Sequence, residues 1–318
     1  MSEEFSLLID GNMAITQYCG GMEKQNSSFA GRPDLLRSRG ECIFCRSADA
    51  TKEDVWPSWM HHAGLLGREM RIKFTGASPQ FGYPNISIRS HLTGSMARLI
   101  VKRLCKCCNN DWGSNIQSRS KPIIMQALDR SIDKMSMDMQ NIIFDWAMCF
   151  SMCVEFVTPQ EVGISQYVRE MFRHGHPLPE SFSVHVGRYA GTAFHLGYQH
   201  NYSRMLYSMD GEPKDLSKVR LGFCEGGPGV QATVVAIGKL VMLVTSIDRC
   251  FGSEPSNFEE LAIPEDAYGD FGLVRIPQGG STDVIDFASL PALYDKSVQD
   301  AALAIFPPEL RKMASRRA

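Results

Sequence analysis

Two pairs of cysteines carry the clearest chemistry in the sequence. Each pair has two residues between its cysteines, and the four are Cys42, Cys45, Cys105 and Cys108. At this spacing a turn directs both sulfurs toward one tetrahedral ion, so the two pairs predict a four-thiolate zinc site. Zinc with four sulfur ligands has no open position for water, and we expect the ion to be structural. Buried thiols without a metal are the alternative, and Cys107 has the wrong spacing to be a ligand.

Cysteine content also bears on the cellular location. The ten cysteines could indicate the disulfides of a secreted protein. The N-terminal sequence, however, has neither a basic segment nor an apolar segment of signal-peptide length. We therefore expect a reducing, cytoplasmic location, where paired cysteines more often bind metal than form disulfides. No apolar segment approaches the roughly 20 residues needed to cross a bilayer, so no membrane segment is predicted.

Two segments beside the cysteine pairs complete a recognisable pattern. Residues 51–59 read TKEDVWPSW after the first pair, and residues 109–115 read NNDWGSN directly after the second. Together with the cysteines, these segments resemble the HNH endonuclease family, specifically its branch with four zinc-binding cysteines. The similarity is close over residues 42–59 and 98–124. Members of that branch have an acid followed by histidine after the first cysteine pair, and two asparagines after the second.

The resemblance implies a ββα-metal fold. In this fold a hairpin and a helix, clamped by zinc, present one catalytic divalent ion to a phosphate of the nucleic acid. Glu53 and Asn109 would be ligands of that ion, while Asn110 or Asn115 would assist or orient the substrate. Carboxylate and amide oxygens suit a hard cation, so Mg²⁺ or Mn²⁺ is the expected catalytic ion. Helix capping is the alternative role for Asn109 and Asn110.

The sequence departs from the family pattern at Asp54. Family members have histidine there, as the general base that takes a proton from the attacking water. A free carboxylate is a weaker base than imidazole, and positioned base catalysis contributes about 10² to 10⁴ in rate. Three interpretations stay open. His61 or His62 is a displaced base, Asp54 is a working variant or an additional metal ligand, or the site is catalytically inactive.

The charge distribution allows only local contacts with nucleic acid. A formal net charge of -2 creates no global attraction for phosphates. Basic residues are nevertheless concentrated between residues 89 and 121. Six of them are candidate phosphate contacts: Arg98, Lys102, Arg103, Lys106, Arg119 and Lys121. DNA is the expected partner and RNA an alternative, although a solvated strand and helix face explains the same run of charge.

The elements that must position these residues predict an α+β protein in three parts. Residues 1–38 are expected to form an N-terminal arm. Residues 39–136 would form the zinc-clamped ββα domain, with a hairpin or loop inserted over 65–93. Residues 137–318 would form a C-terminal domain of helices followed by antiparallel sheet.

Periodicity defines the expected elements of these parts. Helices are expected over 115–136, 141–157, 158–173 and within 291–317, from helical spacing and N-terminal capping signals. Strands are expected over 182–189, 194–198, 219–223, 230–237 and 239–246, with Gly238 in the turn between the last two.

Two functions from different classes fit these features. The first is metal-dependent hydrolysis of DNA by an HNH-type endonuclease that is impaired or inactive if Asp54 cannot act as a base. The second is a non-catalytic protein that binds nucleic acid or another protein and keeps the zinc site for stability.

Overall fold

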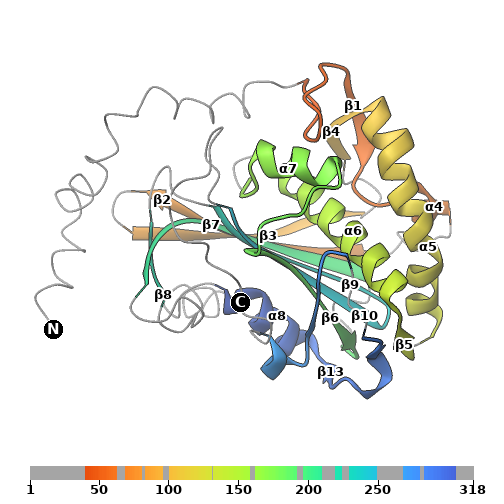
Figure 1. The fold of residues 1–318 in the computed structure, drawn as a ribbon. Helices are drawn as coiled ribbons and strands as arrows, with labels where there is room; N and C mark the ends of the chain where they lie inside the picture. The colour runs from red at the N-terminus through yellow and green to blue at the C-terminus, as the bar shows by residue number, and fades with distance from the viewer. Residues whose placement is uncertain are drawn as a thin grey trace, which may run out of the picture.

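The computed structural model describes residues 40–62, 69–80, 83–95, 100–130, 132–157, 162–191, 196–209, 219–223, 229–248, 268–279 and 283–305. Its architecture is mixed α+β, as the sequence predicts: helices cover both faces of a twisted sheet (Figure 1). The predicted N-terminal arm lies outside the described residues. Within them, no helix combines the length and apolar character needed to cross a bilayer.

Within the described ranges, the main sheet has nine strands. Its path runs β11-β6-β10-β9-β7-β2-β3, while β13 pairs with β6 and β8 pairs with β7. Neighbours are antiparallel except for the parallel pairs β2–β7 and β13–β6. The strands are β2 (Glu69–Gln80), β3 (Tyr83–Ser95), β6 (Phe182–Tyr189), β7 (Leu196–Met209), β8 (Val219–Phe223), β9 (Gly229–Ile237), β10 (Leu240–Asp248), β11 (Val274–Ile276) and β13 (Ala292–Leu293).

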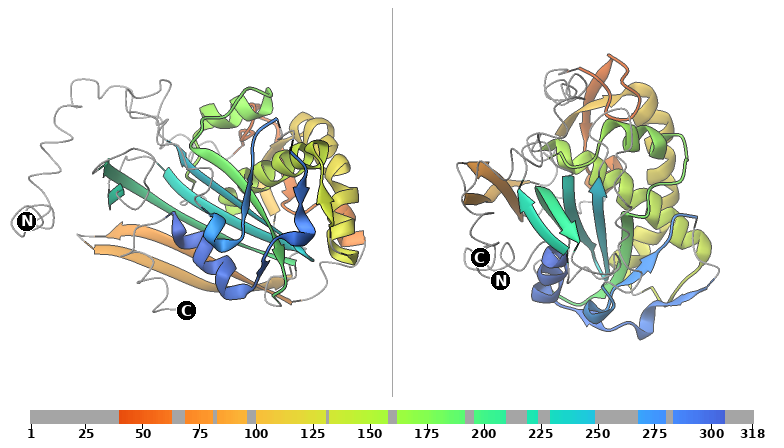
Figure 2. Two further views of the ribbon diagram at one scale, coloured as in Figure 1. Left: turned by 60° about the horizontal axis from the view of Figure 1, so that its bottom comes forward. Right: turned by 60° about the vertical axis from the view of Figure 1, so that its left-hand side comes forward.

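The central strands β9 and β10 are buried on both faces because helices cover both sides. Figure 2 shows α8 (Asp295–Ala304) across the sheet from α5 (Ser114–Asp129) and α6 (Met137–Val154). The turn between β9 and β10 has Gly238 at φ +58°, and an added Cβ there would collide with the Ala127 carbonyl. The predicted glycine turn is therefore confirmed, and it packs directly on the end of α5.

Three short helical segments connect these layers. They are α4 (Ser58–His62), the 3-10 turn η4 (Glu155–Val157) and α7 (Gln166–Arg173). The N-terminus of α7 is capped by Ser165, whose Oγ accepts the Val168 N–H at 3.3 Å. The helix is shorter than the predicted 158–173: residues 158–161 lie outside the described residues, but 162–165 are not helical and α7 begins at Gln166. The short strands β5 (Lys134–Met135) and β12 (Ile285–Asp286) pair with each other. Two further 3-10 turns are η7 (Gly269–Phe271) and η8 (Phe287–Ser289).

The predicted insertion is a hairpin, and it belongs to the main sheet. β2 and β3 pair along their whole length, and β2 also pairs in parallel with β7 over Lys73–Gly76. One buried apolar cluster runs from Cys42 to Phe287, through both the cysteine-containing segments and the sheet. The boundaries 39–136 and 137–318 stay predictions, but the packing is continuous across residue 136.

An ion pair without solvent exposure joins the end of α6 to α7. Glu155 and Arg169 are both fully buried and bonded through Glu155 Oε2 and Arg169 Nη2. The other carboxylate oxygen accepts the N–H groups of Gly163 and Ile164 at 2.9 and 3.2 Å. Arg169 also donates to the Met152 carbonyl at 2.6 Å. Removing one partner would leave a buried charge without compensation.

We expect Glu155→Gln or Arg169→Met alone to lower the free energy of unfolding by about 3–5 kcal/mol, because each leaves one buried partner unpaired. Urea unfolding would measure this. The matched control is Arg46→Gln, which breaks the exposed Arg46–Glu170 pair and should cost under about 1 kcal/mol. Equal effects at the two pairs would contradict the buried-charge argument.

His185 gives stability a defined pH dependence. Its ring is buried in β6 and makes an edge-to-face contact with Tyr268, with ring centroids 4.6 Å apart. Burial, followed by the charge of Arg275, lowers the pKa of His185 to about 3 from 6.5. The unfolded chain thus binds more protons than the folded chain between these values, so stability is lost as pH falls through this window.

We expect His185 alone to reduce the free energy of unfolding by about 2 kcal/mol between pH 7 and pH 5. His185→Gln should flatten this dependence, even if it also lowers stability at pH 7. Urea titrations at the two pH values test this, with His174→Gln as the exposed-histidine control. An unchanged slope in His185→Gln would show that another group causes the acid sensitivity.

Candidate metal centre and active site

A two-stranded pair leads directly into a helix and forms the frame of the site. β1 (Ala50–Asp54) pairs antiparallel with β4 (Ile100–Cys105), with a register irregularity between Thr51 and Glu53. The chain continues from β4 into the π-helical turn η3 (Cys107–Gly113) and then α5. Glycine is required at 113 because an added Cβ would lie 2.8 Å from the Cys108 carbonyl oxygen.

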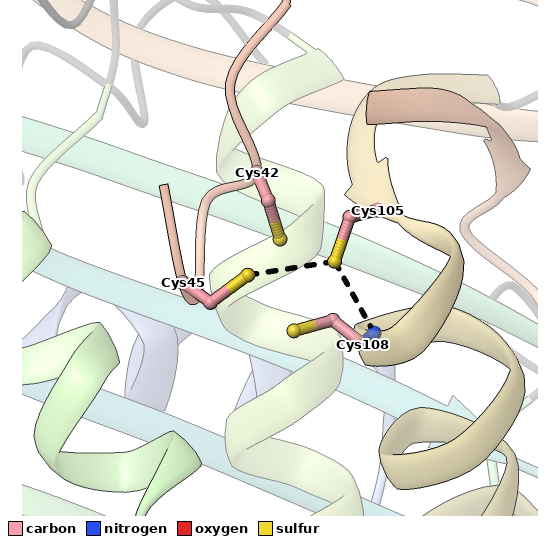
Figure 3. A group of neighbouring side chains, drawn as sticks. All are labelled: Cys42, Cys45, Cys105 and Cys108. Carbon is pink, nitrogen blue, oxygen red and sulfur yellow. Dashed lines mark hydrogen bonds between the residues drawn. The ribbon is translucent and has the colours of Figure 1, made fainter. Parts of the chain in front are cut away.

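The two cysteine pairs converge on one point (Figure 3). The four sulfurs of Cys42, Cys45, Cys105 and Cys108 all lie within 4.8 Å of one another, and the Cys45 and Cys105 sulfurs are 3.4 Å apart. A tetrahedral zinc ion with Zn–S bonds of about 2.3 Å separates its sulfurs by about 3.8 Å. The four-thiol set therefore fits a metal ion such as zinc, and the predicted clustering of these cysteines is confirmed.

Backbone hydrogen bonds position the sulfurs. The loop that carries the first pair turns through Arg46 at φ +58° and is bonded to β4 by the Ile43 N–H and the Arg103 carbonyl at 2.8 Å. In the second pair, the Cys108 N–H donates to the Cys105 sulfur at 3.4 Å. N–H···S bonds of this kind stabilise thiolates and so favour metal binding.

The environment favours ionisation of part of the cluster. A hydrogen bond from Cys108 lowers the pKa of Cys42 to about 4, and the same contact raises the pKa of Cys108. Burial raises the pKa of Cys45 to about 11. One thiolate is thus favoured in the cluster, while the others would lose their protons to a bound metal.

Arg173, at the end of α7, also interacts with the cysteine cluster, and the sequence did not reveal this role. Burial alone would lower the pKa of Arg173, but hydrogen bonding and charge interaction with Cys108 and Cys107 raise it overall. Its guanidinium also lies over the Trp112 ring, 5.2 Å from the centroid. Basic residues are common in the last turn of a helix, where they compensate the helix dipole. The sequence therefore gave no sign that Arg173 has a further role.

Two of the predicted catalytic residues line one cavity. Asp54, at the end of β1, and Asn109, in η3, both contribute to a cavity of about 40 Å³. Most of its other lining side chains are apolar, and its volume is enough for a water molecule. Asn109 Nδ2 donates to Asn110 Oδ1 at 3.1 Å. The two amides are thus bonded to each other, and this bond does not cap a helix. Asn115 lines a neighbouring cleft, which shares Trp112 and Ile116 with this cavity.

Several predicted site residues lie outside what can be described. Glu53 pairs with Val101 through its backbone, but its side chain is outside the described part, as are the side chains of His61 and His62. Arg98 lies outside the described residues altogether. The proposed ligand role of Glu53 and the displaced-base interpretation therefore stay predictions.

The remaining basic candidates have different surroundings. Lys102 and Lys106 are exposed. Arg103 lies over Phe156 and Lys121 over Trp59, at 5.5 and 5.6 Å from the ring centroids. Arg119 pairs with Asp145 at 3.5 Å. Three of these side chains thus have protein partners in addition to solvent.

Comparison of the chain with protein-family models, curated proteins and solved structures found no match in any of the three.

We expect the purified protein to contain about one zinc ion per chain, measured by elemental analysis. Cys42→Ser and Cys108→Ser should each lose it and lower the midpoint of thermal unfolding by about 10 °C or more, because metal binding also stabilises the fold. Cys107→Ser is the matched control, since Cys107 is exposed and outside the four-sulfur group. Full zinc content in both ligand variants would exclude the four-sulfur site.

Proposed function

We propose that this chain is an HNH-type, metal-dependent endonuclease that hydrolyses phosphodiester bonds in DNA, with RNA as an alternative substrate. Zinc would be held by the four cysteines as a structural ion. The catalytic site would be formed by Glu53, Asp54 and Asn109. This function would operate without the histidine that family members have at position 54.

The proposal is supported chiefly by one observation: Asp54 and Asn109 line the same cavity although 55 positions separate them in sequence. The strand–strand–helix order of β1, β4 and η3–α5 is the order that a ββα-metal site requires. The four sulfurs lie at the junction of β4 and η3, where a bound ion would fix the first loop against the start of the helix.

The donor set also suits the proposed chemistry. Asp54 offers carboxylate oxygens and Asn109 an amide oxygen, and both are ligands that Mg²⁺ or Mn²⁺ accepts. When bound, such an ion would stabilise the negative charge that develops on the phosphate. Asp54 is exposed at the strand end, from which its carboxylate can accept a proton from water or bind the ion. Asn109 would hold its oxygen toward the same point.

The base position decides how active the site can be. A carboxylate at position 54 is a weaker base than imidazole and has a shorter side chain, so cleavage by the unmodified chain should be slow. The alternative is a non-catalytic protein that binds nucleic acid. It would have the same zinc site but would not cleave nucleic acid.

We expect Asp54→His to raise the rate of plasmid nicking by about tenfold or more in Mg²⁺ or Mn²⁺, because imidazole restores a better general base. Glu53→Ala or Asn109→Ala in the Asp54→His background should reduce nicking to the background rate. Supercoiled plasmid resolved on agarose gels measures this. Asp54→Asn is the matched control, since it keeps the size of the side chain and removes its basicity.

Nicking by Asp54→His that survives both ligand-site substitutions would indicate a contaminating nuclease and count against the proposed site. If no variant nicks plasmid while DNA binding and zinc content are retained, the non-catalytic alternative replaces the nuclease. Zinc content must be equal in all variants for the comparison to report on the active site.

A further inference from the structure

A second, larger cleft lies beside the metal centre. It has a volume of about 370 Å³, within the range of small-ligand sites. Its walls come from η3 and α5, from α6 and from the end of α7. Along the first wall, Asp111, Asn115 and Arg119 follow one another at intervals of four residues and so share one face of the helix.

The helix that forms this wall also borders the cavity of Asp54 and Asn109. Asn109, Gly113 and Gln117 line that cavity, again at intervals of four residues. Trp112 and Ile116 line both spaces. The proposed catalytic cavity and the cleft therefore lie beside each other, on neighbouring faces of one helix.

Cationic side chains from two separate elements meet in the cleft. Arg119 comes from α5, whereas Arg173 and His174 come from the end of α7. Arg119 is about half exposed and its distance of 3.5 Å to Asp145 is long for an ion pair. A phosphate could take the place of this carboxylate and accept two N–H bonds from the guanidinium. Trp112, which is partly exposed, adds apolar surface on which a sugar or base can pack.

Two acidic residues also line the cleft, and they should oppose the binding of a phosphate there. Asp111 is exposed at its edge, and Asp145 faces Arg119. Burial raises the pKa of Asp145 even against the attraction of Arg119, which shows that its charge is not well solvated. An incoming phosphate would compete with Asp145 for Arg119, so the two residues should affect phosphate binding in opposite directions.

We propose that this cleft binds a backbone phosphate of the nucleic acid, beside the phosphate at Asp54 and Asn109, through Arg119 and His174 with Arg173 alongside. This inference rests on the proposed function, because it places the same strand along two neighbouring faces of one helix. It assigns to the cleft a binding role, separate from cleavage.

The test measures binding of a short fluorescein-labelled DNA duplex by fluorescence anisotropy, without added divalent ions and at several salt concentrations. Arg119→Gln should weaken binding about tenfold and lower the slope of log Kd against log salt concentration by about one. His174→Gln should weaken binding less than Arg119→Gln does. Asp145→Asn should tighten binding about threefold, because it removes the competing carboxylate.

Opposite changes in Kd for Arg119→Gln and Asp145→Asn would distinguish a phosphate site from a structural ion pair. Loss of a structural pair would change Kd in the same direction in both variants. Lys296→Gln on α8, across the sheet, is the matched control and should leave Kd unchanged. If Asp54→His nicks plasmid but Arg119→Gln and Asp145→Asn bind the duplex as the wild type does, the cleft assignment is wrong and the nuclease stands. If no variant binds or nicks DNA, both proposals are wrong.

Discussion

The convergence of four sulfurs on one point is the constraint on which the rest of the site depends. Cys45 and Cys105 are 60 positions apart, and the segment between them contains the long β2–β3 hairpin. A loop of this length is entropically costly to close, and a metal ion that closes it contributes most when the loop is long. The first loop is bonded to β4 through the Ile43 N–H and the Arg103 carbonyl, and β1 after it pairs with β4. The position of Asp54 relative to Asn109 follows from this closure, because each residue lies close in sequence to one of the two cysteine pairs.

Aromatic packing connects the metal centre to the rest of the protein. Phe44, between the first two cysteines, packs edge-to-face on Trp112, which in turn contacts Phe172 of α7. On the other side of the site, Trp56 packs on Phe150 of α6, and Phe150 on Tyr198 of β7. These contacts explain why one buried cluster spans the cysteine segments and the sheet. The segments with the four cysteines therefore pack on α6, α7 and β7, which come from the part of the chain after residue 136.

Local patterns predicted what depends on local chemistry. Cysteine spacing identified the metal ligands, and alternation gave β6 and β8 with their observed bounds, because these features need only neighbouring residues. β7 was expected to end at Tyr198 but continues to Met209, since pairing with β2 and β8 extends it beyond its own apolar segment. The predicted helix over 115–136 ends earlier, at Asp129, where Arg130 becomes extended. The contact of Arg173 with the cysteines could not be predicted from the sequence. It depends on where α7 packs, and no neighbouring residue in the sequence indicates that a cysteine lies close to it.

Charge balance gives α7 a part in the site. A zinc ion with four thiolates has a formal charge of -2, and a phosphate that approaches within a few ångströms would be repelled by it. Arg173 lies between the Cys108 sulfur and the cleft, and Arg46 of the first loop is bonded to Glu170 of the same helix at 2.6 Å. α7 thus holds a positive charge against the sulfurs and ties the loop in place. Without that charge, the ion that organises the proposed active site would also oppose its substrate. The four clustered cysteines come from before residue 136, whereas the cation beside them, Arg173, comes from the part of the chain after that residue.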